Sequence, residues 1–287
     1  APDAIAAARL GAASERTLAM GLHEAEDGHG AVLLFPPGAD SEPVWLVSDA
    51  SGSAGPVRGM GKTLAAGGDT DGDGLRELAV GTALSGAVLV YTGEAQAGVD
   101  AASEHVVRRA AAPWTPLTMG EVLRFAGDVN GDGYDELLVA DTTDAANGSA
   151  DTEYIGEARL YYGTPAGLDA DTEQRLYPQD GGARLFRFGL SATAGDLDGD
   201  GHSDITLLSA ALEDEAEGEL HVLLGGPEGA LAAPRERLSW AESDQIRAGV
   251  VRALDLDGDG GRDLLLAQPG GTGEGVLALR WWRTGSQ

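Results

Sequence analysis

Short apolar runs alternate with glycine-rich turns along the whole chain. The runs are about four to eight residues long and rich in valine, leucine and tyrosine, as in residues 86–93 and 156–163, which is typical of β-strands. The chain has 44 glycines among its 287 residues, and this share favours many turns over long helices. The pattern therefore predicts an all-β protein.

The predicted strands belong to a repeat of about 60 residues. Four segments align, each with an acidic loop followed by an apolar run: residues 67–81, 126–140, 194–208 and 253–267. Their first aspartates are Asp69, Asp128, Asp196 and Asp255, which are 59, 68 and 59 residues apart. Each repeat has one predicted strand before the loop and three after it. Such four-stranded units are typical of a β-propeller, whereas a sandwich lacks so regular a period and solenoid coils are much shorter.

The N-terminal part of the chain fits the same repeat without the acidic residues. Residues 15–21 and 30–38 match the second and third strands, and counting back places Ala7, Arg9 and Gly11 at the positions of the aspartates. We therefore expect one domain, residues 1–287, with five repeats, of which the first lacks a metal loop and the last lacks its fourth strand. The approximate repeats are 1–58, 59–117, 118–186, 187–246 and 247–287.

The acidic loops carry oxygen-bearing residues at alternate positions. In the loop that starts at Asp69, carboxylates occupy positions 1, 3, 5 and 9, position 7 offers its backbone carbonyl, and Gly74 at position 6 permits a sharp turn. The other loops follow the same order. The predicted ligands are Asp69, Asp71, Asp73, Leu75 and Glu77; Asp128, Asn130, Asp132, Tyr134 and Glu136; Asp196, Asp198, Asp200, His202 and Asp204; and Asp255, Asp257, Asp259, Gly261 and Asp263.

This ligand chemistry indicates calcium. All predicted ligand atoms are hard oxygens, because the residues at position 7 contribute only their carbonyls. Ca²⁺ binds about six to eight such oxygens, whereas Zn²⁺ prefers nitrogen and sulfur, and Mg²⁺ prefers a tighter octahedron with more water. Three or four crowded carboxylates repel one another without a cation. A solvated acidic turn could explain one loop, but four loops in register predict about four Ca²⁺ ions.

The net charge of −28 narrows the range of partners. Nucleic acids and anionic membrane surfaces attract lysine and arginine, and this chain has 19 basic residues against 47 acidic ones. Four Ca²⁺ ions would reduce the formal charge to about −20.

Cysteine is absent, so the chain has neither disulfides nor thiolate metal sites. No apolar run approaches the roughly 18 residues that span a bilayer, so we expect no membrane insertion.

The loops and their flanking residues resemble the FG-GAP repeat of integrin α-subunit propellers and their bacterial relatives. Phe188 and Gly189, followed by the loop that starts at Asp196, form the copy most similar to that repeat. Met60-Gly61, Met119-Gly120 and Ala248-Gly249 stand where the other repeats would have the Phe-Gly pair. The resemblance implies a propeller with calcium loops on one face and ligand binding on the other. Family propellers commonly have seven blades, so five repeats either close as a smaller ring or form part of a larger one.

The resemblance also implies a function. Calcium sites of extracellular modules bind at about 10⁻⁴–10⁻³ M, which predicts a secreted or cell-surface protein. Since no catalytic constellation is visible, we expect a non-enzymatic adhesion or interaction module that contacts another protein or a surface glycan. The contacting loops would join the second and third strands, at residues 23–29, 141–154 and 212–218. The alternatives are a carbohydrate-binding lectin and a calcium-dependent lyase or phosphatase, while His23 and His29 are a weaker candidate for a transition-metal site.

Overall fold

The computed structural model shows an all-β protein, as predicted. Among the described residues the only helix is the four-residue α1 (Ala25–Gly28), so none is long and apolar enough to cross a membrane. The structure describes residues 4–8, 10, 16–37, 42–46, 51–52, 55–82, 85–94, 98–101, 103, 105–108, 120–142, 156–176, 185–211, 219–230, 236–239, 250–258, 261–268 and 278–282.

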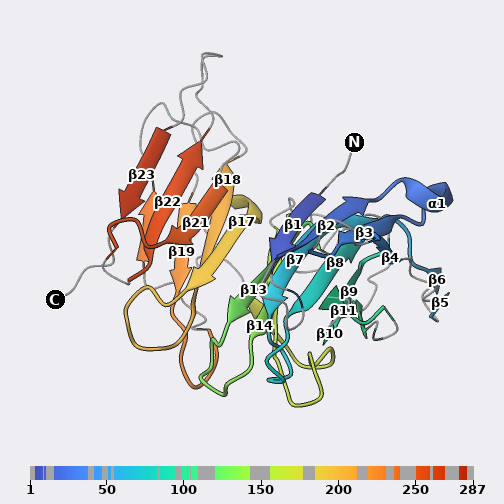
Figure 1. Ribbon diagram of the computed structural model, residues 1–287. Coiled ribbons are helices and arrows are strands. Elements are labelled where there is room, and N and C mark those ends of the chain that lie inside the picture. The colour runs from blue at the N-terminus through green and yellow to red at the C-terminus, as the bar shows by residue number, and fades with distance from the viewer. Residues whose placement is uncertain are drawn as a thin grey trace. The chain divides into compact units, whose positions relative to one another are not determined.

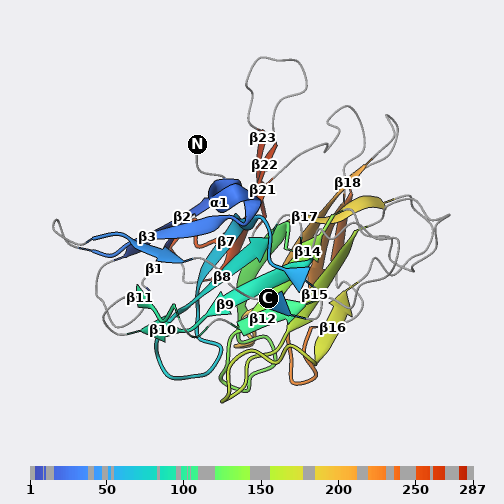
Figure 2. The same cartoon turned by 90° about the vertical axis from the view of Figure 1, so that its right-hand side faces the viewer.

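The strands form successive sheets in which chain neighbours pair (Figures 1 and 2). The first sheet has β1 (Ala4–Ala8), β2 (Thr17–Leu22), β3 (Ala31–Phe35) and β4 (Val44–Leu46). The second has β7 (Met60–Gly68), β8 (Glu77–Thr82), β9 (Ala87–Tyr91) and β12 (His105–Arg108). The third has β13 (Val122–Gly127), β14 (Glu136–Asp141), β15 (Glu157–Tyr161) and β16 (Glu173–Leu176). The fourth has β17 (Leu185–Gly195), β18 (Asp204–Ala211), β19 (Glu219–Leu223) and β20 (Glu236–Ser239).

The last sheet and two small hairpins complete the described strands. The fifth sheet has β21 (Val250–Leu254), β22 (Asp263–Gln268) and β23 (Ala278–Trp282). The hairpins pair β5 (Ser51–Gly52) with β6 (Gly55–Pro56), and β10 (Gly93–Glu94) with β11 (Gly98–Val99). The predicted order, with one strand before each acidic loop and three after it, is confirmed in the second, third and fourth repeats. Closure of the sheets into a five-bladed propeller stays a prediction.

Contacts within the chain divide it into two compact units. Unit 1 comprises Ala1–Phe125, Tyr134–Val139 and Leu160–Glu173, and unit 2 comprises Ala126–Gly133, Ala140–Arg159 and Gln174–Gln287. The first two sheets lie in unit 1, the last two lie in unit 2, and the third sheet contributes segments to both. The single domain expected from the sequence stays a prediction.

Sheets pack face to face inside each unit. In unit 1, Val32 of β3 shares a core with Leu78 of β8, while Val88 of β9 lies in a second core with Leu137 of β14. Every residue of β8 and β9 is buried, because both faces of the second sheet are covered. This burial explains why the central strands read as continuous apolar runs rather than as alternating ones. In unit 2, the fourth and fifth sheets share a third core.

The strand register corrects the prediction for the first repeat. Gly195 pairs with Asp204 at position 9 of its loop, and the equivalent pair in the first sheet is Ala8 with Thr17. Position 9 is therefore Thr17, and position 1 is Arg9 rather than the predicted Ala7. A shift of two residues leaves every side chain on the same face of its strand, so the apolar pattern could not reveal the error. The corrected frame places no carboxylate at positions 1, 3, 5 and 9, and Glu15 falls at position 7, where the other loops would bind through the backbone carbonyl.

Candidate metal-binding loops

The acidic loops at Asp69, Asp128 and Asp196 share one backbone turn, and all four loops occupy the same place between two strands. Each begins directly after the first strand of its sheet and ends on the first residue of the second strand. The position 1 carboxylate accepts a hydrogen bond from the N–H of the position 6 glycine, at 3.1 Å from Gly74 to Asp69 and 3.0 Å from Gly201 to Asp196. Gly74 has a φ of +84°, a left-handed conformation that glycine adopts without strain. The glycines therefore allow each loop to fold around its own first carboxylate.

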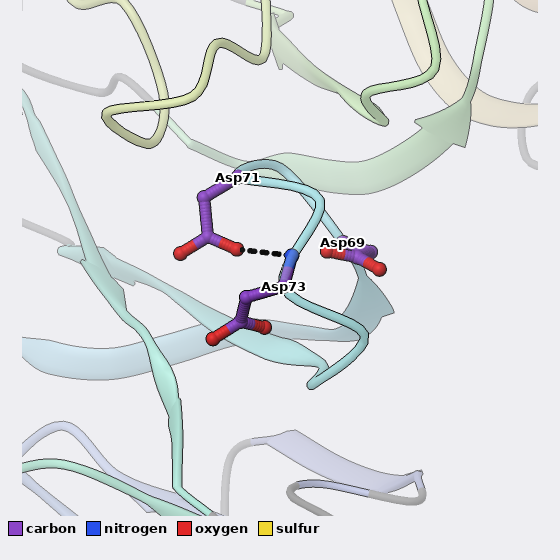
Figure 3. Close-up of side chains that lie close together, drawn as sticks. All are labelled: Asp69, Asp71 and Asp73. Atoms are coloured by element: carbon purple, nitrogen blue, oxygen red, sulfur yellow. Dashed lines mark hydrogen bonds between the residues drawn. The ribbon is translucent and has the colours of Figure 1, made fainter.

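The predicted carboxylates come together in three of the four loops. One oxygen from each member of a group lies within 4.8 Å of the others in the groups Asp69, Asp71 and Asp73; Asp196, Asp198 and Asp204; and Asp255, Asp257 and Asp263. Figure 3 shows the first group gathered around one turn, where the Asp73 N–H donates to the Asp71 carboxylate at 3.0 Å. Asp200 also accepts an N–H bond, from His202 at 2.9 Å. Asp259 lies outside the described residues.

The loop at Asp128 is divided between the two units. Asp128, Asn130 and Asp132 lie in unit 2, whereas Tyr134 and Glu136 lie in unit 1. In unit 2 the Asn130 side-chain amide donates to Asp132 at 2.9 Å. Asp128 accepts the N–H of Gly133 at 2.9 Å, which is the same bond that the loops at Asp69 and Asp196 make at this position. The loop therefore has the backbone turn of those two loops, with an amide in place of one carboxylate.

The acidic residue at position 9 is the buried member of each loop. Glu77, Glu136 and Asp204 have no exposed surface, and Asp263 is 3% exposed. Asp204 Oδ2 accepts the N–H of Leu197 at position 2, at 2.7 Å, and its Oδ1 accepts the N–H of Gly225 at 2.9 Å. Asp204 therefore holds both the start of its own loop and the glycine two residues after the third strand.

Glu77 and Asp204, the buried acids at position 9 of two loops, have raised pKa values. Burial raises the pKa of Glu77 to about 7; the nearby Asp71 adds to this shift, while the N–H of Thr70 opposes it. Burial also raises the pKa of Asp204, and the charges of Asp198 and Asp200 act in the same direction. Because the charged form is disfavoured at both positions, a cation would offset the repulsion between the carboxylates.

Two buried oxygens are suited to a hard cation. Asp69 Oδ1 and Glu77 Oε1 accept no hydrogen bond of normal geometry from any described residue, although the Gly93 N–H lies near enough to lower the pKa of Glu77. A buried carboxylate oxygen without a partner is unfavourable by about 1–3 kcal/mol. Coordination by a divalent cation would satisfy both atoms. The donor set, carboxylates with a backbone carbonyl at position 7, suits calcium better than a nitrogen-seeking metal.

Backbone hydrogen bonds join the first loop to the following repeat within unit 1. The N–H of Asp135, at position 8 of the third repeat, donates to the carbonyl of Asp69 at 2.9 Å. The N–H of Thr164 donates to the carbonyl of Thr70 at 3.0 Å. A Cβ on Gly163 would lie 2.7 Å from the Thr70 carbonyl oxygen, so this close approach needs glycine.

The same inter-repeat bonds recur within unit 2. The N–H of Ser203 donates to the carbonyl of Asp128 at 2.8 Å, and the N–H of Gly226 donates to the carbonyl of Val129 at 2.8 Å. A Cβ on Gly225 would lie 2.5 Å from the Ser203 carbonyl oxygen. Sequence reasoning missed these bonds because backbone atoms make them. The available signal was the glycine two residues after the third strand, which recurs as Gly93, Gly163 and Gly225.

A serine and a histidine meet in the fourth sheet, away from the acidic loop. Ser209 Oγ lies 3.1 Å from His221 Nε2, and Glu219 Oε2 lies 3.6 Å from the same nitrogen. Ser209 has no exposed surface and His221 is 1% exposed, with its ring in a T-shaped contact with that of Phe188. In a catalytic triad the carboxylate approaches the other ring nitrogen and the serine reaches substrate. These contacts therefore describe a buried structural cluster.

The buried histidine predicts a loss of stability in acid. Burial lowers the pKa of His221 from 6.5 to about 4, so the unfolded chain binds the proton more readily than the folded one. Neutral His221 therefore contributes fully to the free energy of unfolding above about pH 6.5. This free energy falls by about 3 kcal/mol as the pH decreases to about 4. The residue of β9 that corresponds to His221 is Leu89. His221→Leu should therefore fit the sheet and remove this loss of stability. Urea denaturation of both proteins across this pH range is the measurement, and parallel curves would contradict the prediction.

The loops predicted to contact a partner are described only in part. Residues 23–29 include α1, and His29 Nδ1 lies 3.2 Å from the carbonyl oxygen of Val57. His23 lies 3.9 Å from the carboxylate of Glu24. The two histidines are not among the residue groups that gather metal ligands in the described part of the chain. Residues 143–154 and 212–218 lie outside the described residues.

The chain is similar in sequence to integrin α chains. It is 26% identical over 233 residues to integrin alpha pat-2 of Caenorhabditis briggsae, covering 76% of this chain and 18% of that one. It is 30% identical over 155 residues to integrin alpha-4 of Xenopus laevis, covering 52% and 14%, and 29% identical over 150 residues to integrin alpha-PS2 of Drosophila melanogaster, covering 48% and 10%. The chain thus spans less than a fifth of the length of these relatives. No protein-family model matches it.

Solved structures show a weaker likeness. A mutant of AofleA from Arthrobotrys oligospora superposes with a TM-score of 0.46 at 13% identity, over 97% of this chain and 68% of that one. A rhamnogalacturonan lyase of Bacillus licheniformis superposes with a TM-score of 0.41 at 14% identity, over 91% and 57%. Likeness at this level assigns neither the fold nor the function.

Proposed function

We propose that this chain is a calcium-stabilised extracellular module that binds another protein, built from five FG-GAP-type blades of a β-propeller. The successive sheets, each of four strands in the first four repeats, support the repeat architecture. The similarity to integrin α chains supports an adhesion or interaction role. The relatives are far longer than this chain, so their similarity supports a binding module rather than any particular partner.

The gathering of three carboxylates within 4.8 Å in each of three loops carries the calcium proposal. Each group includes or adjoins a buried position 9 acid, and burial disfavours its charge unless a cation is present. We propose the twenty residues predicted from the sequence as ligands, with the position 7 residues binding through their carbonyls. Bound calcium would supply positive charge and join the first strand of a sheet to the second.

The predicted weak affinity of such sites favours an extracellular setting. Calcium modules outside the cell commonly bind at about 10⁻⁴–10⁻³ M, and sites of that strength fill only where calcium is abundant. We therefore propose that the protein works at the cell surface or after secretion.

The partner surface is proposed at the ends of the sheets opposite the acidic loops. Successive antiparallel strands reverse direction, so the connection between the second and third strands opens at the other end from the loop between the first and second. Segments presented by a rigid scaffold commonly carry binding residues. The proposed surface comprises residues 23–29, 141–154 and 212–218.

Loop replacement tests this placement. Replacing residues 143–154 and 212–218 of this surface by short glycine-serine turns should abolish binding to a partner found by screening purified extracellular proteins in calcium. The melting temperature should change little, because the replacements leave β14, β18 and the buried Asp141 and Thr142 unchanged. The control replaces Pro227 and Glu228, exposed residues of a turn at the calcium end of the fourth sheet, by glycine and serine. Binding that survives the first replacement but not the second would reverse the proposed orientation.

A further inference from the structure

One carboxylate from the third repeat joins both ends of the acidic loop in the second repeat. Asp135 Oδ2 accepts the N–H of Asp69 at 3.0 Å and a guanidinium N–H of Arg76 at 3.1 Å. Asp69 and Arg76 are positions 1 and 8 of the same loop. We call this arrangement the Asp135 bridge, and all three residues lie in unit 1.

We propose that Asp135 is a positioning residue for the calcium site at residues 69–77, an inference that rests on the proposed calcium function. The bridge fixes the backbone of Asp69, whose carboxylate supplies the first ligand. It also holds Arg76, which directly precedes the last ligand, Glu77. Groups that orient metal ligands from outside the coordination shell commonly change metal affinity by about 10–100-fold when they are replaced. Asp135 therefore sets the affinity of a site to which it contributes no ligand.

The Asp135 bridge is partly exposed, so it should contribute more to the positioning of the calcium ligands than to the stability of the fold. The Arg76 and Asp135 side chains are 43% and 23% exposed, and ion pairs at such exposure contribute little to folding. The charge matters more to a bound metal, because Arg76 places a positive charge within the calcium loop. Asp135 compensates that charge at 3.1 Å. Its loss should therefore weaken calcium binding more than it weakens the fold.

The bridge distinguishes one loop from its neighbour. The residue that corresponds to Asp135 in the fourth repeat is Ser203, which keeps the backbone bond to Asp128 but has no charged side chain. The loop at Asp69 is thus held by a backbone bond and a carboxylate, whereas the segment at Asp128 is held by the backbone bond. Asp135→Ser converts the first arrangement into the second.

A tyrosine beside the loop provides a local probe. A Cβ on Gly72, at position 4 of the loop, would lie 2.9 Å from Cε1 of Tyr134, so the Tyr134 ring packs against that glycine. Terbium binds in calcium sites of this chemistry and emits light when a nearby excited tyrosine transfers energy to it. Tyr134 also belongs to the loop at Asp128, so Asp71→Ala, which removes a proposed ligand of the loop at Asp69, separates the two sites. The component of the emission that is lost in both Tyr134→Leu and Asp71→Ala therefore reports the site at residues 69–77.

The test titrates the calcium-free full chain with terbium, and displaces the terbium with calcium, in Asp135→Asn and in the natural sequence. Asp135→Asn should weaken terbium binding at residues 69–77, the emission component that Asp71→Ala lacks, about tenfold, while the melting temperature in EDTA should match that of the natural sequence. Asp171→Asn is the matched control, since it removes the same charge from an exposed turn in the same repeat, and it should leave the affinity unchanged. Asp135→Ser is a second variant with the same expected result.

The outcomes separate the bridge from the calcium proposal. Affinity that is unchanged in both Asp135 variants overturns the positioning role and leaves calcium binding intact. An equal loss of melting temperature in EDTA and in calcium, or failure of both variants to fold, assigns Asp135 a purely structural role and also overturns it. Absence of terbium and calcium binding in the natural sequence would overturn the proposed function itself.

Discussion

Removal of calcium is expected to lower the melting temperature of this protein by roughly 10 °C or more. A site with calcium at about ten times its Kd stabilises the folded chain by about 1.4 kcal/mol, so about four sites contribute about 6 kcal/mol. For domains of similar size, about 1 kcal/mol corresponds to about 2–4 °C. Thermal denaturation followed by circular dichroism, in about 10 mM calcium and then in excess EDTA, measures the difference.

Magnesium is the control for this experiment. Mg²⁺ has the same charge but prefers six ligands at shorter distances, so it should restore only a small part of the lost stability. Full restoration by magnesium would indicate a general charge effect on a chain of net charge −28. A melting temperature that is the same with and without chelator would contradict calcium binding by the loops.

The second large effect is expected from Asp204→Ala, which should destabilise the fold by about 3 kcal/mol or more even in EDTA. The substitution removes the acceptor of two backbone N–H groups, those of Leu197 and Gly225. Hydrogen bonds to charged groups contribute about 1.5–3 kcal/mol each, and the donors would be left buried without a partner. The free energy of unfolding from urea titration measures the loss.

Asp198→Ala is the matched variant, since Asp198 is an exposed member of the same carboxylate group. It should change stability little in EDTA but lower the additional stability that calcium provides. The two variants thus separate the structural role of position 9 from the metal-binding role that the loop positions share. Equal losses in EDTA would show that the buried carboxylate does not hold the loop.

Strand order was predictable because the acidic loops repeat at nearly constant spacing and the central strands are mainly apolar. Residues 77–82 and 87–91 form strands of full burial, as their composition indicates. The first repeat was placed two residues too early because strand pairing, which sets Thr17 opposite Ala8, leaves no mark on the apolar pattern. Sequence thus specified which segments are strands, while pairing specified their register.

The gathering of acidic side chains was predictable in part, since alternate carboxylates around a glycine turn have few other arrangements. Contacts between repeats could not be predicted from the sequence. Asp135 appeared to be one more acidic residue, and nothing in its neighbours along the chain reveals that it bonds to Asp69 and Arg76. His221 lies between apolar residues in β19, and its contact with Ser209 depends on the pairing of β18 with β19. Such contacts require the register of the sheets.

The bonds between repeats have a consequence for how such a chain diverges. Their donors and acceptors are main-chain groups, at Thr70 in one repeat and Val129 in the next, so the side chain at that position is free to change. The accompanying glycines are not free to change, because Gly163 and Gly225 approach neighbouring carbonyls too closely for a Cβ. Natural sequence variation should therefore accumulate at the positions of Thr70 and Val129 and be absent at those of Gly163 and Gly225. A duplicated repeat would bring its own backbone donors and acceptors. The number of repeats can therefore increase by duplication without new side-chain contacts between neighbouring repeats.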